Sequence, residues 1–178
     1  LLYPSTPAEA KGLLLAAFED PNPVLFFEHK ALYRSLSEPV PEGYYTLPIG
    51  QARMVREGSA LSIITYGMGV HWALEACSEL DIDADIIDLR SLSPVDWATI
   101  ESSVTRTSKA LVLHEDNLTG GIGGEIAAHI SEHCFEQLDA PVLRVAAMDT
   151  PVPFAQSLEK QYLPLSALKE KLLRLQAY

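Results

Sequence analysis

The residues best suited to chemistry lie in one stretch, residues 110–130, with the sequence ALVLHEDNLTGGIGGEIAAHI. Its first four residues form a short apolar run, which is typical of a strand buried on both faces of a parallel sheet. The polar triplet His114-Glu115-Asp116 follows where such a strand would leave the core. Four glycines then precede a helix-like segment at 125–130. Ligands of parallel sheets bind beyond the carboxyl ends of the strands, so this loop is the first candidate for a functional site.

Two interpretations compete for the four glycines, which are Gly120, Gly121, Gly123 and Gly124. Bare backbone N–H groups at a helix N-terminus can hold an anion. Alternatively, the glycines allow positive φ angles and close packing of the helix on the sheet. The spacing departs from the G-x-G-x-x-G dinucleotide pattern, and Glu125 would bring negative charge to an anion site, so the pattern favours the structural interpretation. His114 is likewise more typical of a hydrogen-bonded histidine at a strand end than of a catalytic base.

A second polar group, Asp88-Leu89-Arg90, ends another apolar run. Its aspartate and arginine can form an ion pair that fixes a crossover loop, and as a catalytic pair they would need a pocket. The structural role is favoured. The sequence contains no H-E-x-x-H, Walker or G-x-S-x-G motif. The residues alone therefore indicate an acidic α/β domain without a recognisable catalytic template.

Composition narrows the possible partners and the compartment. The chain has 178 residues, is 48% hydrophobic and carries a net charge of −11. This charge opposes binding to nucleic acid or to an anionic membrane, and favours a basic protein partner. Cys77 and Cys134 form neither a metal motif nor a disulfide framework, which fits a reducing compartment, the cytoplasm or, in a eukaryote, the mitochondrial matrix. No apolar run is long enough to span a membrane.

The first 28 residues predict one helix and one strand. Thr6 can cap the helix, Pro7 suits its first position, and Glu9 completes a capping box. Residues 19–23 end the helix, and residues 24–28 predict a buried strand. These two elements are too few to bury a core, so residues 1–28 are interpreted as the tail of a domain whose earlier part is missing. The start at Leu1, without a methionine, also suggests a fragment.

Residues 29–50 predict a linker punctuated by proline and glycine. Residues 51–178 predict a second domain in which strands and helices alternate, which is typical of a mostly parallel sheet with helices on both faces. The expected strands are 52–56, 61–66, 84–89, 110–113 and 142–146. The expected helices are 71–80, 96–103, 125–130 and a last helix capped by Ser166.

Several motifs along the chain belong together. They are PSTPAEAKGLL at 4–14, FFEHK at 26–30, LYR at 32–34, IDLRSLSP at 87–94, His114-Glu115, Gly120-Gly121 with Glu125-Ile126, and DTPVP at 149–153. In combination they resemble the beta subunit of thiamine diphosphate-dependent 2-oxo acid dehydrogenases, and the resemblance covers essentially the whole chain. The Leu32-Tyr33-Arg34 motif is closer to the branched-chain (2-oxoisovalerate) type than to the pyruvate type.

This resemblance implies that residues 1–28 end a pyrimidine-binding domain and that residues 51–178 form a transketolase-like carboxy-terminal domain. The parent enzyme would decarboxylate a branched 2-oxo acid and acylate the lipoyl group of an acyltransferase. In the family, the glutamate that activates thiamine and the catalytic histidine lie upstream of Leu1. The alpha subunit, or a fused alpha half, supplies the diphosphate and magnesium site. We therefore expect this fragment to bind no thiamine diphosphate and to be inactive alone.

The resemblance also implies a structural potassium site. The matching positions are Ala17 and Asn22, which would offer backbone carbonyls, and Asp20, which would offer a carboxylate oxygen. Such hard oxygen donors at a helix end suit an alkali cation. The alternative is that Asp20 and Asn22 merely end the helix. Without the upstream ligands, occupancy is not expected.

The family's carboxy-terminal domains pair about a two-fold axis and receive the basic subunit-binding domain of the dihydrolipoamide acyltransferase. A homodimer that docks this domain is therefore expected. Two alternatives remain: a free-standing non-catalytic adapter, or the tail of another transketolase-like enzyme, such as a pyruvate dehydrogenase beta subunit or a transketolase. The partial domain at residues 1–28 favours the enzyme fragment over the adapter.

Overall fold

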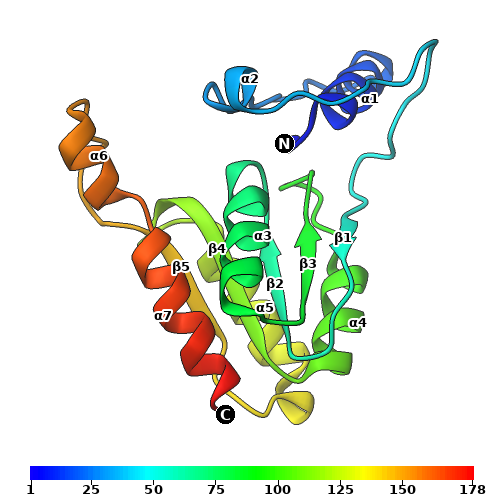
Figure 1. The fold of residues 1–178 in the computed structure, drawn as a ribbon. Coiled ribbons are helices and arrows are strands. Elements are labelled where there is room, and N and C mark those ends of the chain that lie inside the picture. The colour runs from blue at the N-terminus through cyan, green and yellow to red at the C-terminus, as the bar shows by residue number, and fades with distance from the viewer.

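The computed structural model describes residues 1–178 and contains one five-stranded sheet with the strand order β1-β3-β2-β4-β5 (Figure 1). The strands are β1 (Arg53–Arg56), β2 (Leu61–Thr65), β3 (Ala84–Asp88), β4 (Ala110–Asn117) and β5 (Leu143–Ala147). The last four are parallel, and β1 pairs with β3 as an antiparallel edge strand. This confirms the predicted mostly parallel α/β sheet.

Helices cover both faces of the sheet, as predicted. One face packs against α3 (Met68–Leu80) and α7 (Leu165–Gln176), and the other against α4 (Trp97–Thr107) and α5 (Gly123–His133). Each of these helices begins or ends a few residues away from the expected position, which is usual for boundaries inferred from sequence.

The core divides into two clusters because successive strand residues point to opposite faces. In β2, Ile63 belongs to one cluster and Ile64 to the other. In β4, Leu111 and Val112 divide in the same way. All five residues of β2 are buried, so the uninterrupted apolar run reflects burial on both sides.

Two helix starts test the capping predictions. Asp96 caps α4, because its Oδ1 accepts the backbone N–H of Thr99 at 3.1 Å. The predicted cap at Ser166 is wrong. Helix α7 begins one residue earlier, at Leu165, with Pro164 at the N-cap position and no side-chain cap. The fixed φ of proline already places the chain for a helix, so the helix begins before Ser166.

The N-terminal segment, residues 1–50, lies across the carboxyl end of the sheet (Figure 1). It contains α1 (Pro7–Glu19) and a single-turn helix, α2 (Leu32–Ser35), inside the predicted linker. Thr6 caps α1 as predicted, accepting the backbone N–H of Glu9 at 3.3 Å. The Glu9 side chain accepts from Ser5 rather than from Thr6, so the capping box is displaced by one residue.

The predicted buried strand at 24–28 is wrong. Phe26 forms a single bridge with Leu2, whereas the side chains of Leu25 and Phe27 are 61% and 46% exposed. A strand needs neighbours along its length to satisfy its backbone and cover its side chains. Here Leu2 is the one residue that pairs with this segment.

The segment between α2 and β1 has no regular structure but packs against α1. The hydroxyl of Tyr45 donates to the carbonyl of Ala8 at 2.7 Å, and the Leu47 N–H donates to the carbonyl of Gly12 at 3.1 Å. A side chain at Gly12 would collide with Tyr45 and Leu47, so this glycine permits the contact. The segment between α2 and β1 is therefore docked on α1.

One helix lies apart from the layers that cover the sheet. Helix α6 (Gln156–Tyr162), which the sequence did not predict, projects away from the sheet (Figure 1).

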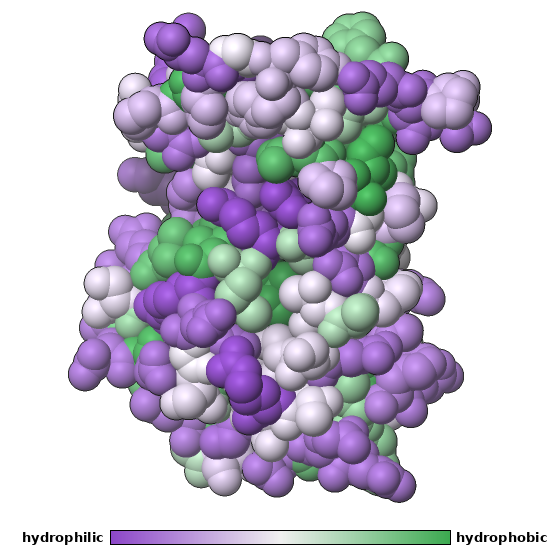
Figure 2. Space-filling model, turned by 90° about the vertical axis from the view of Figure 1, so that its right-hand side faces the viewer, coloured by the Kyte–Doolittle hydropathy of each residue, from purple (hydrophilic) through white to green (hydrophobic).

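In the view turned by 90°, hydrophilic residues gather where the N-terminal segment meets the sheet domain (Figure 2). None of the helices has the length and apolar character that crossing a membrane requires.

Candidate functional site

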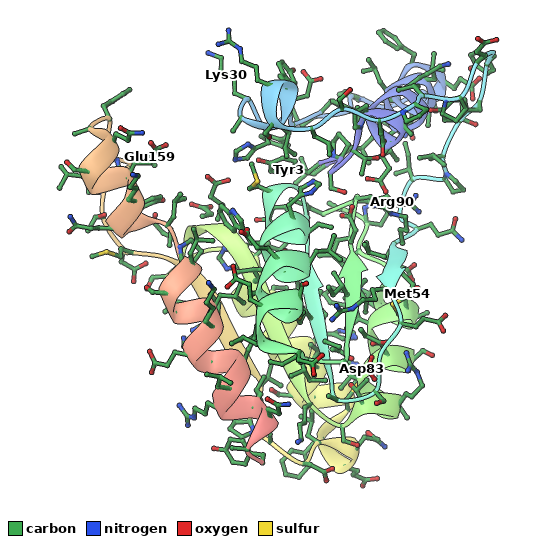
Figure 3. All side chains as sticks on the ribbon, in the orientation of Figure 1. Tyr3, Lys30, Met54, Asp83, Arg90 and Glu159 are labelled. Atoms are coloured by element: carbon green, nitrogen blue, oxygen red, sulfur yellow. The ribbon has the colours of Figure 1, made fainter.

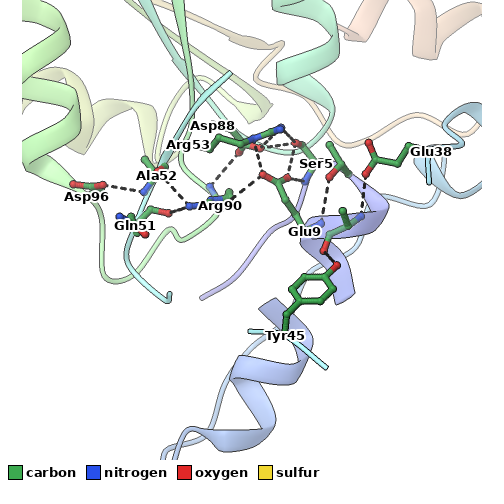
Figure 4. Close-up of polar contacts among 12 residues, drawn as sticks. Ser5, Glu9, Glu38, Tyr45, Gln51, Ala52, Arg53, Asp88, Arg90 and Asp96 are labelled. Atoms are coloured by element: carbon green, nitrogen blue, oxygen red, sulfur yellow. Dashed lines mark hydrogen bonds and ion pairs between the residues drawn. The ribbon is translucent and has the colours of Figure 1, made fainter. Parts of the chain in front are cut away.

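Charged side chains meet where the N-terminal segment rests on the carboxyl end of β3 (Figure 4). We call this group the joint cluster, and it consists of Ser5, Glu9, Arg53, Asp88 and Arg90. Figure 3 shows Arg90 at the end of the sheet that faces the N-terminal segment and Asp83 at the opposite end. The cluster thus occupies the edge of the sheet at which parallel α/β proteins bind ligands.

Asp88 is the centre of the joint cluster. Its side chain is fully buried, and its Oδ2 lies 2.5 Å from the hydroxyl of Ser5. The same hydroxyl donates to Oε2 of Glu9 at 2.9 Å, so Ser5 connects the two carboxyl groups. Arg53 supplies positive charge, with its Nε 2.8 Å from Oε1 of Glu9 and its Nη2 3.9 Å from Oδ2 of Asp88.

Arg90 holds the loop after β3 in an unusual conformation. Its φ is +55°, in the left-handed region that non-glycine residues seldom occupy. Its backbone N–H donates to Oδ1 of Asp88 at 3.1 Å, and its carbonyl accepts from Tyr3 at 2.8 Å. Its guanidinium donates to the carbonyl of Gln51. Asp88 therefore contacts Arg90 through the backbone, and the ion pair expected between their side chains is replaced by pairs with Arg53 and Glu9.

Burial, and after it the neighbouring carboxylate of Glu9, raises the pKa of Asp88 to about 8. The Ser5 hydroxyl, Arg53 and the backbone N–H of Arg90 oppose this effect. In the protonated form, Asp88 can donate to Ser5, which in turn donates to Glu9. Because Asp88 is inaccessible to solvent, the cluster is suited to joining two segments rather than to acting on a substrate.

The glycine loop is shaped by His114. A Cβ added to Gly121 would lie 2.5 Å from Cε1 of His114, and one added to Gly123 would lie 2.5 Å from its Nε2. Gly120 has a φ of +81°, whereas Gly124 has an ordinary φ and would place a Cβ 3.4 Å from Arg144. Three of the four glycines thus have a structural reason, which favours the structural interpretation of the loop.

The His114 ring is fully buried, and neither ring nitrogen has a hydrogen-bond partner. Burial lowers its pKa, and the carboxylate of Asp116 partly offsets that effect. A neutral ring enclosed by backbone fills space. The expected hydrogen bond at this strand end is absent.

The residues of the predicted potassium site lie together at the C-terminal end of α1. The carbonyl of Ala17 has no helical partner because residue 21 is a proline and lacks an N–H group. Asp20 follows the last helical residue, and its Oδ1 accepts both the backbone and the side-chain N–H groups of Asn22. These oxygen donors are of the kind that an alkali cation prefers. One oxygen of the Asp20 carboxylate already accepts the two hydrogen bonds from Asn22.

Sequence reasoning found Asp88 and Arg90 but missed Ser5, Glu9 and Arg53 as their partners. Glu9 was recognised as a capping residue, and Arg53 as part of an edge strand. The available sequence signal was an acidic residue, Glu9, on an otherwise apolar first helical turn. The sequence separation of 83 residues between Ser5 and Asp88 carries no local pattern that links them.

Comparisons with known proteins define the class. Residues 50–167 match the family model of the transketolase C-terminal domain, so the chain belongs to this family. A solved structure described as a split gene transketolase, an inactive beta4 tetramer, shares the fold, with a TM-score of 0.75 over 99% of this chain and 56% of the other at 23% identity.

Curated relatives extend the match beyond that domain. The chain is 47% identical over 167 residues to the 2-oxoisovalerate dehydrogenase subunit beta of Bacillus subtilis, covering 92% of this chain and 51% of the relative. It is 48% identical, with the same coverage, to the pyruvate dehydrogenase E1 component subunit beta of that organism. It is 46% identical to the acetoin:2,6-dichlorophenolindophenol oxidoreductase subunit beta there, covering 92% and 48%. The chain therefore spans about half the length of these relatives.

Proposed function

We propose that this chain is the carboxy-terminal part of the beta subunit of a 2-oxo acid dehydrogenase complex, and that it serves subunit assembly. The observation that carries the proposal is the extent of the match, since 92% of the chain aligns with beta subunits whereas the domain model begins at residue 50. The N-terminal segment is part of that match and is fastened to the sheet domain by the joint cluster.

The parent enzyme would decarboxylate a 2-oxo acid and acylate a lipoyl group. We favour a branched-chain acid because of Leu32-Tyr33-Arg34, although the identities of 47% and 48% to the two types are nearly equal. Activity of a complex rebuilt with the complete beta subunit, measured on 2-oxoisovalerate and on pyruvate, tests this choice. A preference for pyruvate would contradict the branched-chain assignment.

Thiamine diphosphate and magnesium would be held by the rest of the parent, including its alpha subunit or fused alpha half. No three His, Cys, Asp or Glu side chains converge in this structure. The joint-cluster carboxylates are already engaged with Ser5 and Arg53. Calorimetric titration of the chain with cofactor and magnesium should give no binding heat, and micromolar binding would contradict the proposal.

Ala17, Asp20 and Asn22 would contribute to a potassium site that the longer subunit completes. The unpaired carbonyl of Ala17 beside the Asp20 carboxylate supports this role. The melting temperature of this chain should be the same in potassium chloride and sodium chloride at equal ionic strength. Potassium-specific stabilisation should appear in the complete subunit and disappear with Asp20→Ala.

Docking is the assembly role that the charge supports. A net charge of −11 favours a basic partner, because opposite charges speed the encounter and complement each other across the interface. The subunit-binding domain of a dihydrolipoamide acyltransferase is expected to be such a partner. We propose that the chain forms a homodimer that receives this domain in the cytoplasm, or in the mitochondrial matrix of a eukaryote. Sedimentation tests the dimer, and titration at low and high salt tests the docking. A monomer that does not bind the domain at low salt would favour a free-standing adapter.

A further inference from the structure

A cavity of about 430 Å³ lies between the N-terminal segment, the end of β4, the chain before α6 and the last residue of α6. Eight of its ten lining residues are hydrophobic, and the other two are Glu115 and Asp116. The hydrophobic residues include Tyr3, Phe27 and Tyr66, whose rings pack in series with centroid distances of 6.0 and 5.3 Å. We call this the aromatic cavity. Its volume is within the range of small-ligand sites, about 300–1,000 Å³.

The charged side chains that line the aromatic cavity all have the same sign. No lysine, arginine or histidine lines it. Glu115 contacts one histidine outside the lining, His29, whose Nε2 is 2.6 Å from Oε2. Asp116 is exposed and forms no ion pair with a basic side chain. The cavity therefore repels anions and retains carboxylate oxygens available to a cationic ligand.

The same carboxylates act on the hydroxyl groups of Tyr3 and Tyr66. Burial raises the pKa of Tyr3 to about 12, and Glu115 contributes to the rise. Burial also raises the pKa of Tyr66, and Asp116 is the next largest cause. A carboxylate that opposes phenolate formation would attract a cation placed in the same space.

We propose that the aromatic cavity binds a guanidinium group carried on an aliphatic arm, as in an arginine side chain. Guanidinium is planar and weakly hydrated, so it can stack on aromatic rings while donating to carboxylate oxygens. The aliphatic arm suits the apolar lining. The source is an arginine within a polypeptide, because the free amino acid would bring its own carboxylate near Glu115 and Asp116.

The test is a titration of the full chain with three probes, in which nuclear magnetic resonance and calorimetry measure binding. N-acetyl-arginine methylamide should bind saturably and about tenfold more tightly than its neutral isostere, N-acetyl-citrulline methylamide. Free arginine should bind more weakly than the blocked form. Stronger binding of free arginine would support the guanidinium site and contradict the polypeptide source, because the ligand would then be a small metabolite. Equal binding of the citrulline compound, or no saturable binding, would overturn the proposal.

Substitutions in the lining of the aromatic cavity test whether the guanidinium group binds there. Asp116→Asn and Glu115→Gln should each weaken binding severalfold without unfolding the chain, because one side chain is exposed and the other half-buried. Tyr66→Leu should weaken binding by removing a ring face. Glu136→Gln removes the same charge from an exposed residue outside the cavity and should have no effect. Equal losses in Asp116→Asn and Glu136→Gln would show a nonspecific charge effect and refute the site. All ten lining residues belong to this chain, so the titration needs no other subunit and its failure would not count against the proposed enzyme assembly.

Discussion

The hydroxyl of Ser5 lies 2.5 Å from Oδ2 of Asp88, which joins the start of the N-terminal segment to the carboxyl end of β3. Both residues are buried, and Asp88 shares this hydroxyl with the carboxyl group of Glu9. The attachment between the two segments is therefore polar and desolvated, so its strength depends on protonation as well as on packing.

The first prediction concerns this protonation. The folded-state pKa of Asp88 is about 8, above its ordinary value of 3.8, so the folded chain binds the extra proton between these values. The contribution of Asp88 to stability is thus largest at low pH and is lost as the pH rises from about 4 to 8. Asp88→Asn imitates the protonated form. Urea unfolding at about pH 5 and pH 8.5 should show a smaller loss with pH in Asp88→Asn than in the unmodified chain. An equal or larger loss in the variant would contradict this assignment.

The second prediction concerns Glu9. Its side chain is the counter-charge of Arg53, at 2.8 Å, and lies 3.9 Å from Arg90. Glu9→Gln should lower the free energy of unfolding by about 1–3 kcal/mol, because two guanidinium groups lose their buried partner. Limited proteolysis should also cut residues 29–50 faster. Glu170→Gln, at an exposed position in the middle of α7, is the matched control and should change neither measurement. Unchanged protease resistance in Glu9→Gln would mean that the joint cluster does not hold the segment.

The third prediction separates two adjacent glycines. Gly123→Ala should lower the free energy of unfolding by about 1–3 kcal/mol, because its Cβ would collide with the enclosed ring of His114. Gly124→Ala should be tolerated or slightly stabilising, since its φ is ordinary and its Cβ would meet only the end of the Arg144 side chain. Chemical unfolding of both variants checks the difference, and equal losses would contradict it.

The sheet could be predicted from the sequence because its signals are local. The buried runs around Ile63, Ile86 and Leu111 are apolar without interruption, and the helices between them fix a parallel order. The strand expected at 24–28 was wrong for the opposite reason. Its apolar residues match a buried strand, but burial depends on neighbours, and here only Leu2 pairs with it.

The candidate site was less predictable because its members come from distant segments. Asp88 and Arg90 stood out at a strand end, whereas their partners Ser5 and Arg53 have no sequence feature that links them to β3. The short helices α2 and α6 were also missed, because four and seven residues are too few to show helical periodicity. The aromatic cavity likewise combines residues as distant as Tyr3 and Tyr162.

The last prediction concerns His114, whose burial lowers its pKa below the ordinary value of 6.5. As the pH falls through about 6.5, the unfolded chain takes up a proton that the folded chain resists, so the folded state loses stability. The contribution is fully present above that pH. It opposes the Asp88 effect, in which stability falls as the pH rises, so a variant must separate the two. His114→Phe keeps a ring against Gly121 and Gly123 but cannot titrate. Between about pH 7 and pH 5, the stability of His114→Phe relative to the unmodified chain should increase. If the difference stayed constant, His114 would not be the residue that resists protonation.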